Sequence, residues 1–411
     1  MKHRFLSASI ALSSLSFSTL ATDFIDPNQL PEWFSKSLVQ EKELGESRPV
    51  PFAAFGLNLM LPGKVQNHNT DDPTYWYHTI DIGTGTAIEC YSFTEYDGTA
   101  NSLHAIVQEG VNQSAVVNQM KLNNQFNFAL DTGMIGNSPY ILEDRLYILE
   151  NEKNKTIGVV KGMSATTEQG LHICIHNEVG YRETFKSVFT NYLSGFQNNE
   201  NKAGFFEPVY QVSFNGMPIG FSREIYTVDQ DGDVGILNDS SYLIPVSANE
   251  MASSDSVSNS WSSPDGSLIN ANEYAVENST LGSNFAIQVK DDKWFVQGEL
   301  QGKAVESELQ YDGWLLSGFG SYIKTKALME SDAESAEYYM WSSEADPVTA
   351  LKVTMTKIHD DPQVNMLVDM GPVKMRFKVA ENGIIERALL EQGPLKMNLE
   401  LVHVRGVPKL P

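Results

Sequence analysis

The sequence V-K-M-R-F-K-V at residues 373–379 alternates apolar and basic side chains without a break. Successive side chains of a β-strand point to opposite faces, so the apolar and the basic residues of this stretch would lie on different faces. An Asn-Gly pair at 382–383, a signal for a tight hairpin turn, precedes a second alternating run at 395–401. The apolar positions are Val373, Met375, Phe377 and Val379, then Leu395, Met397, Leu399 and Leu401. This pattern predicts antiparallel strands with one buried face and one face in water.

The same pattern extends back to residue 205. Tyr210, Val212 and Phe214 alternate with polar residues, an Asn-Gly pair follows at 215–216, and a strand is expected at 219–228. We therefore predict a mainly antiparallel β half-barrel or sandwich domain over 205–411. A sheet with a single apolar face must cover that face, by closing into a barrel, packing on a second sheet or wrapping round a helix.

Three features of this region carry a resemblance to a known family. They are the run Y-x-V-x-F-x-G-x-x-I-G at 210–220, the sequence P-D-G-S-L at 264–268 after a serine-rich stretch, and the Asp-Pro pair at 346–347 before the closing hairpins. With these features, residues 205–406 resemble the periplasmic half-barrel proteins related to the lipoprotein carrier LolA. The resemblance implies a curved sheet wrapped round an apolar cavity.

The first half of the chain mixes strands and helices. Apolar and β-branched runs predict strands at 55–61, 75–82, 86–94, 126–130, 141–149, 156–164 and 171–178, and helical spacing predicts helices at 101–118 and 181–196. This order predicts an α+β domain over 51–197, in which two helices pack on an antiparallel sheet. In topology it resembles the PsbP-type domains, which are mostly binding modules. The polar stretch 198–204 is expected to be a linker.

The chain begins with features of a cleavable signal peptide at 1–21. Lys2 and Arg4 precede an apolar, serine-rich core, and Thr19 and Ala21 suit the positions that a signal peptidase recognises. A membrane anchor is the alternative, but its core would be shorter than the roughly 20 apolar residues of a spanning helix. Residues 22–50 would then form an N-terminal arm, either extended or with a short helix that has Leu30, Trp33, Phe34 and Leu38 on one face. We expect an exported, soluble protein that is periplasmic or secreted.

The charge of the chain excludes some partners. It has 29 Lys and Arg residues against 52 Asp and Glu residues, a net charge of −23. Nucleic acids and anionic membrane surfaces are bound by clustered basic residues, so neither is an expected partner.

Cys90 and Cys174 are the two cysteines of the sequence. Both fall in predicted strands of the first domain, and an exported protein meets an oxidising environment. We predict that they form a disulfide bond, which would stabilise the fold by about 4 to 5 kcal/mol in the chain-entropy description.

Two short motifs imitate metal sites. The sequence H-I-C-I-H places His172, Cys174 and His176 on one strand face and could bind zinc or copper, but alternate residues lie about 6.7 Å apart along a strand. The competing interpretation is a partly exposed sheet face. Asp229, Asp231 and Asp233 imitate the start of a calcium loop that lacks its glycine and its closing Glu, so a polar hairpin turn is favoured. We expect no metal and no other cofactor.

The sequence contains no complete nucleophile motif. There is no Gly-x-Ser-x-Gly, and Ser321-x-x-Lys324 imitates the dyad of β-lactamases without the accompanying Lys-Thr-Gly. We expect this pair in a β segment, whereas the dyad needs the start of a helix.

Methionines and tryptophans of the second half are candidates to line an apolar cavity. The candidate ligand-binding residues are Trp294, Trp314, Trp341, Met340, Met355, Met375 and Met397. An ordinary sheet core is the alternative.

These observations favour a non-enzymatic envelope protein whose second domain binds an apolar or amphiphilic ligand, or another envelope protein. The alternative is a periplasmic hydrolase with a dispersed site between the domains, in which His78, His104 or His359 would need acidic neighbours. A third possibility is a purely structural protein.

Overall fold

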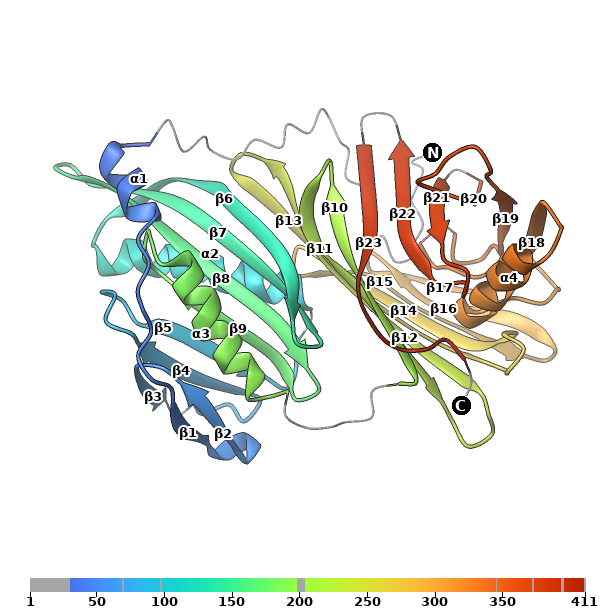
Figure 1. Cartoon of the computed structure of the whole chain (residues 1–411), viewed down its shortest axis with the longest axis horizontal. Coiled ribbons are helices and arrows are strands. Elements are labelled where there is room, and N and C mark those ends of the chain that lie inside the picture. The colour runs from blue at the N-terminus through green and yellow to red at the C-terminus, as the bar shows by residue number, and fades with distance from the viewer. Residues whose placement is uncertain are drawn as a thin grey trace. The chain divides into compact units, whose positions relative to one another are not determined.

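A computed structural model describes residues 30–68, 70–96, 98–197, 204–344, 346–371, 373–392 and 395–409 (Figure 1). The predicted signal peptide at 1–21 lies outside the described residues, as does the predicted linker at 198–204 except for its last residue. The chain divides into two compact units. The described part of the first unit is residues 30–197 with 243–253, and that of the second is 204–242 with 254–409. The fold class is as predicted, an α+β unit followed by a mainly antiparallel β unit.

The first unit has, within the described residues, a seven-stranded antiparallel sheet in the order β3-β4-β5-β9-β8-β7-β6. Its strands are β3 (Lys64–His68), β4 (Tyr75–Asp81), β5 (Ile88–Phe93), β6 (Lys121–Ile135), β7 (Ser138–Glu150), β8 (Lys155–Thr167) and β9 (Gly170–His176). The predicted helices are confirmed as α2 (Thr99–Val117) and α3 (Arg182–Ser194), which cover opposite faces of the sheet (Figure 1). Gly162 allows α2 to pack closely, because a Cβ at this position would lie 2.3 Å from the Val107 side chain.

The expectation of a partly exposed face on β9 is wrong. All seven residues of this strand are buried. Ile175 faces α2, and Cys174 on the other face shares a core with Phe185 and Val188 of α3. With a helix on each side, no face of this central strand meets water, so both sets of alternating side chains are buried.

A short helix and a hairpin precede this sheet. α1 (Glu32–Leu38) is the helix that the spacing of apolar residues predicts. Phe34 is fully buried, and Leu30 and Leu38 pack against the same core cluster, but Trp33 is half-exposed, so the predicted face is wrong for that residue. β1 (Arg48–Phe52) and β2 (Leu57–Leu61) then form a separate two-stranded sheet, linked by the short helix η2 (Ala53–Phe55).

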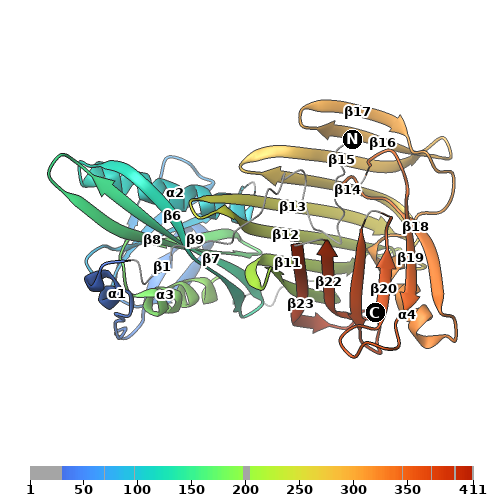
Figure 2. The ribbon, with the colours of Figure 1, turned by 90° about the horizontal axis from the view of Figure 1, so that it is seen from above.

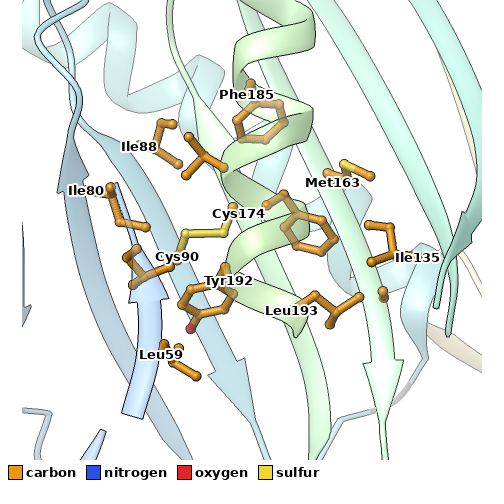
Figure 3. Close-up of a cluster of buried hydrophobic side chains, with 14 of the residues drawn as sticks. Leu59, Ile80, Ile88, Cys90, Ile135, Met163, Cys174, Phe185, Tyr192 and Leu193 are labelled. Carbon is orange, nitrogen blue, oxygen red and sulfur yellow. A yellow bond between two sulfur atoms is a disulfide. The ribbon is translucent and has the colours of Figure 1, made fainter. Parts of the chain in front are cut away.

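Cys90 and Cys174 are joined by a disulfide in the core beneath α3 (Figure 3). They are opposite each other in the pairing of β5 with β9, and 84 positions separate them in the sequence. Buried side chains of neighbouring strands and of α3 surround the bond, among them Ile80 of β4, Ile88 of β5 and Tyr192 of α3. The disulfide thus joins two strands that are neighbours in the sheet and distant in the chain.

The second unit is built, within the described residues, on a fourteen-stranded antiparallel sheet, of which the hairpin tip at 243–253 belongs to the first unit. In sheet order, β17-β16-β15-β14-β13-β12-β11-β10 is followed by β23-β22-β21-β20-β19-β18. The strands are β10 (Phe206–Phe214), β11 (Met217–Val228), β12 (Val234–Ser247), β13 (Glu250–Ser262), β14 (Leu268–Glu277), β15 (Thr280–Lys290), β16 (Lys293–Leu300), β17 (Lys303–Glu308), β18 (Ser335–Met340), β19 (Leu351–Lys357), β20 (Met366–Asp369), β21 (Lys374–Val379), β22 (Ile385–Gln392) and β23 (Leu395–Gly406). The first strand therefore pairs with the last, and the sheet continues outward from this pair in both directions.

The alternation in the closing strands is confirmed. In β21 the apolar residues Met375, Phe377 and Val379 are buried, while the basic residues between them are not. The predicted Asn-Gly turn joins β21 to β22, and Gly383 has a φ of +85°, a backbone conformation that residues with side chains rarely adopt. One face of these strands is buried and the other meets water, as the sequence predicts.

Strands β18–β23 run across the direction of β11–β17 (Figure 2). α4 (Gly318–Glu330) lies beside β18 in the same unit (Figure 2). This helix was not predicted from the sequence, and its N-cap residue Ser317 accepts a hydrogen bond from the backbone nitrogen of Gly320. Ser321 and Lys324 therefore lie on a helix, and the expectation of a β segment there is wrong.

Loss of the disulfide should destabilise the first unit. The double variant Cys90→Ala/Cys174→Ala is expected to lower the free energy of unfolding by about 4 kcal/mol, since the chain between the cysteines is no longer closed in the unfolded state. Urea unfolding followed by hydrogen exchange of first-unit peptides measures the change. Thiol titration of the denatured, unreduced wild-type protein should find no free thiol, and two free thiols would contradict the assignment.

Candidate ligand-binding cavity

The second unit contains a cavity of about 210 Å³. Its lining comes from the consecutive strands β10–β14, from α4, and from β18 and β20–β22. Because these elements lie far apart in the order of the sheet, the sheet must curve for strands β10–β14 to line one space with β18 and β20–β22. The cavity occupies the apolar face, which α4 covers in part.

Strand register brings the lining residues to one face. Glu224 and Tyr226 of β11 are paired with Asn238 and Ile236 of β12. Residues that are directly opposite in an antiparallel pair point to the same side, and all four line the cavity. The face is therefore mixed in character, with polar residues among apolar ones.

The apolar part of the wall comes mainly from residues next to α4 and from β18 and β20–β22. It includes Leu316, Met340, Trp341, Val368, Phe377 and Ile385. The Trp341 indole nitrogen donates a hydrogen bond of 2.9 Å to the Pro347 carbonyl, which fixes the ring in this wall.

Glu224 marks a polar region of the cavity. The Tyr226 hydroxyl donates a hydrogen bond of 2.7 Å to its Oε2 atom. Burial raises the pKa of Glu224, and the hydrogen bond from Tyr226 opposes this shift. Burial together with the neighbouring Glu224 carboxyl raises the pKa of Tyr210 and of Tyr226.

Glu273 on β14 is a second carboxyl group in the lining. Its Oε2 atom accepts hydrogen bonds from the backbone nitrogen of Ser343 at 2.8 Å and from the Ser343 hydroxyl at 2.6 Å. Burial raises the pKa of Glu273, and these hydrogen bonds oppose the shift. β12 and β13 lie between β11 and β14, so the backbones of Glu224 and Glu273 are separated by three strand spacings, about 14 Å.

Ser321 also lines the cavity, and its hydroxyl lies 2.6 Å from the Tyr338 hydroxyl. Burial raises the pKa of Tyr338 to about 12, so this phenol is a poor base at neutral pH. Lys324, one turn along α4, is exposed and does not line the cavity. Ser321 lies near the start of a helix, as the serine of a β-lactamase dyad does. Lys324, however, is not placed to activate it.

Two of the candidate ligand-binding residues line this cavity, namely Met340 and Trp341. The other five lie elsewhere. Met355, Met375, Met397 and Trp294 are buried in the sheet core, and Trp314 is 80% exposed. Further lining residues were not predicted from the sequence, namely Glu224, Glu273 and the four tyrosines Tyr210, Tyr226, Tyr322 and Tyr338. Their only sequence signal is a polar or aromatic residue on the apolar face of a strand, which is too common in this chain to be selective.

The histidines around Cys174 have structural partners. His172 lies 2.9 Å from the hydroxyls of both Ser92 and Thr167, and His176 lies 3.2 Å from the Thr84 hydroxyl. Cys174 is in the disulfide. Throughout the described ranges, no three His, Cys, Asp or Glu side chains gather as a metal ion would require.

The aspartates after β11 form the predicted hairpin turn. One carboxylate oxygen of Asp229 accepts hydrogen bonds of 2.9 Å from the backbone nitrogens of Asp231 and Asp233. The turn joins the ends of β11 and β12, where Val228 pairs with Val234.

The three histidines considered for a hydrolase site differ in their surroundings. His104 lies 3.0 Å from the fully buried Glu143 carboxylate, and His359 lies 2.9 Å from Glu334 on an exposed surface. His78 instead lies 2.9 Å from the Asn67 side chain. In the part of the chain that the structure describes, neither His104 nor His359 has a hydroxyl within hydrogen-bond distance, so neither forms a nucleophile pair.

Comparison with known proteins identifies no family. No protein-family description and no curated protein matches the sequence. The chain is similar to a solved β-barrel-like protein of the domain of unknown function DUF1849 from Brucella abortus, at 12% identity and a TM-score of 0.38, over 49% of this chain and 98% of that one. A DUF1089 protein from Pseudomonas aeruginosa matches at 15% identity and a TM-score of 0.26, over 40% of this chain and 87% of that one. Relationships to LolA and to PsbP-type domains stay predictions.

None of the helices in the described ranges combines the length and the hydrophobicity of a membrane span. 

The stability of the first unit should fall in mild acid. Burial lowers the pKa of His78 to about 4 and of His172 and His176 to about 3. In the unfolded chain these residues take up protons near pH 6.5, so the unfolded state binds more protons than the folded state between pH 6.5 and 4. Each histidine should lower the free energy of unfolding by about 2 kcal/mol between pH 7 and pH 5. Urea unfolding at the two pH values measures the loss.

Two variants separate the contribution of the buried histidines from that of other groups that bind protons in mild acid. His172→Gln should remove about one third of this loss, while His359→Gln, at the exposed position, should leave it unchanged. An equal pH dependence in wild type and His172→Gln would show that His172 is not held in its neutral form.

Proposed function

We propose that this protein is exported and that its second unit binds an apolar or amphiphilic small molecule. The observation that carries the proposal is the cavity in the apolar face of the curved sheet. Protein interiors are close-packed, and large voids in them are few. The cavity of about 210 Å³ is partly open to solvent, so a ligand that fills it would bury its own apolar surface together with that of the wall.

The size of the cavity limits the ligand. An engineered cavity of about 150 Å³ holds benzene, and the pockets of drug-sized ligands are about 300 to 1,000 Å³. At about 210 Å³ this cavity suits a small molecule or the end of one hydrocarbon chain, rather than a lipid with two chains. Met340 at its wall is a flexible, polarisable side chain of the kind that adapts to varied apolar partners.

Two observations support the export of the protein. The disulfide between Cys90 and Cys174 suits an oxidising compartment. The sequence at 1–21 has the order of charged, apolar and small residues that characterises a signal peptide. A periplasmic or secreted binding protein would meet envelope lipids and their breakdown products as available ligands.

Filling the cavity with a larger side chain should weaken binding. Ala271 on β14 is a small residue in the lining, and Ala271→Phe would place a ring in the space that a ligand occupies. The neutral fluorescent probe N-phenyl-1-naphthylamine should bind the wild-type protein with one saturable site, and the variant should bind it about tenfold more weakly or worse. Fluorescence titration measures both affinities.

Ala304→Phe on β17 is the matched control, because Ala304 is exposed and lies outside the cavity. It should bind the probe as the wild type does. A folded Ala271→Phe variant with wild-type affinity would contradict the proposed site.

A further inference from the structure

We infer that the ligand is a cationic amphiphile, with an ammonium head group at Glu224 and a hydrocarbon tail along the apolar wall. The inference rests on the proposed function, because it names the chemistry of the molecule that the same cavity would bind. The charges of the lining residues select the head group.

The lining contains acids without bases. Glu224 and Glu273 face the cavity, and among the described lining residues there is no Lys, Arg or His. A fatty acid or a phosphate ester would bring its negative charge near two carboxyl groups with no cation to neutralise it. Such an arrangement disfavours anionic ligands strongly in a space from which water is partly excluded.

Glu224 has a free acceptor atom for a cation. Its Oε2 accepts the hydrogen bond from Tyr226, while its Oε1 has no hydrogen-bond partner among the described residues. The Tyr210 hydroxyl likewise has none among them, although this residue also lines the cavity. An ammonium group beside Glu224 could donate to both oxygens.

Aromatic residues add to the attraction. Tyr210 and Tyr226 are close to Glu224, Tyr322 is close to Tyr226, and all three line the cavity. Tyrosine rings attract cations through their electron-rich faces, and the effect is larger when the cation is desolvated. A carboxylate together with several aromatic rings is a set of side chains that suits a primary ammonium group.

Burial makes the pairing selective. A carboxyl group alone in this surrounding favours its neutral form, which is why the pKa of Glu224 is raised. A bound ammonium lets it ionise and form a charge-assisted hydrogen bond, which a neutral alcohol cannot do. The cation is therefore preferred over an uncharged head group as well as over an anionic one.

Glu273 is a weaker candidate than Glu224 to bind the ammonium head group. Its Oε2 already accepts two hydrogen bonds from Ser343, which satisfy much of its capacity as an acceptor. Its backbone lies about three strand spacings, roughly 14 Å, from that of Glu224. It adds a second acidic group to a lining that has no basic residue among the described residues.

A chain-matched series of ligands tests the inference on the unmodified protein. Octylamine, octanol and octanoic acid share one tail and differ in the charge of the head group at pH 7.5. Each is titrated against the protein with bound N-phenyl-1-naphthylamine, and displacement gives the affinity. We expect octylamine to bind at least about tenfold more tightly than octanol, and octanoic acid to bind most weakly.

The variant Glu224→Gln removes the charge and keeps the size of the side chain. Its affinity for octylamine should fall about thirtyfold, since a buried charge pair loses one partner, while its affinity for octanol should stay within about threefold of wild type. Glu306→Gln on the exposed edge strand β17 is the control and should change neither. Glu273→Gln should lower the affinity for octylamine less than Glu224→Gln does.

The outcomes separate this inference from the proposed function. If neither the probe nor any of the three ligands binds, the proposed function fails and the inference with it. If octanol or octanoic acid binds as tightly as octylamine, the cavity still binds amphiphiles but the cationic head group is wrong. An amine preference that survives Glu224→Gln would overturn the placement at Glu224.

Discussion

A curved sheet with one apolar face must keep that face from water, and the architecture of the second unit follows from this constraint. The hydrogen-bonded pairing of β10 with β23 joins the two series of hairpins into one sheet. Its curvature brings strands from both series round a common space, and α4 covers part of it. The remainder is the cavity, where Glu224 and Glu273 lie in a wall of mixed polar and apolar residues. Fold and candidate site therefore have the same physical origin.

The first unit meets the same constraint differently. α2 and α3 cover both faces of its sheet, so β9 is buried along its whole length and its histidines are held among hydroxyl groups in the core. The disulfide between Cys90 and Cys174 fastens this core at its centre. The contrast explains why the candidate site is in the second unit, where one face of the sheet has only partial cover.

Local patterns in the sequence predicted much of the fold but little of the site. The alternation at 373–379 and the spacing of α2 and α3 were sufficient, because each depends on residues close in the chain. α4 was missed because the residues that it buries include Gly320 and Thr325 as well as Phe319 and Leu328, so it has no continuous apolar stripe. Glu224 could not be selected from 52 acidic residues, since its role depends on strands that are distant in sequence.

The central claim is that the cavity of the second unit holds a small amphiphile, and native mass spectrometry of the protein purified from its own cell envelope tests it most directly. The account predicts a population heavier than the processed polypeptide by the mass of one small molecule, which is released on denaturation and carries an amine. A protein that shows only the polypeptide mass, under conditions in which added octylamine is retained, would contradict the account.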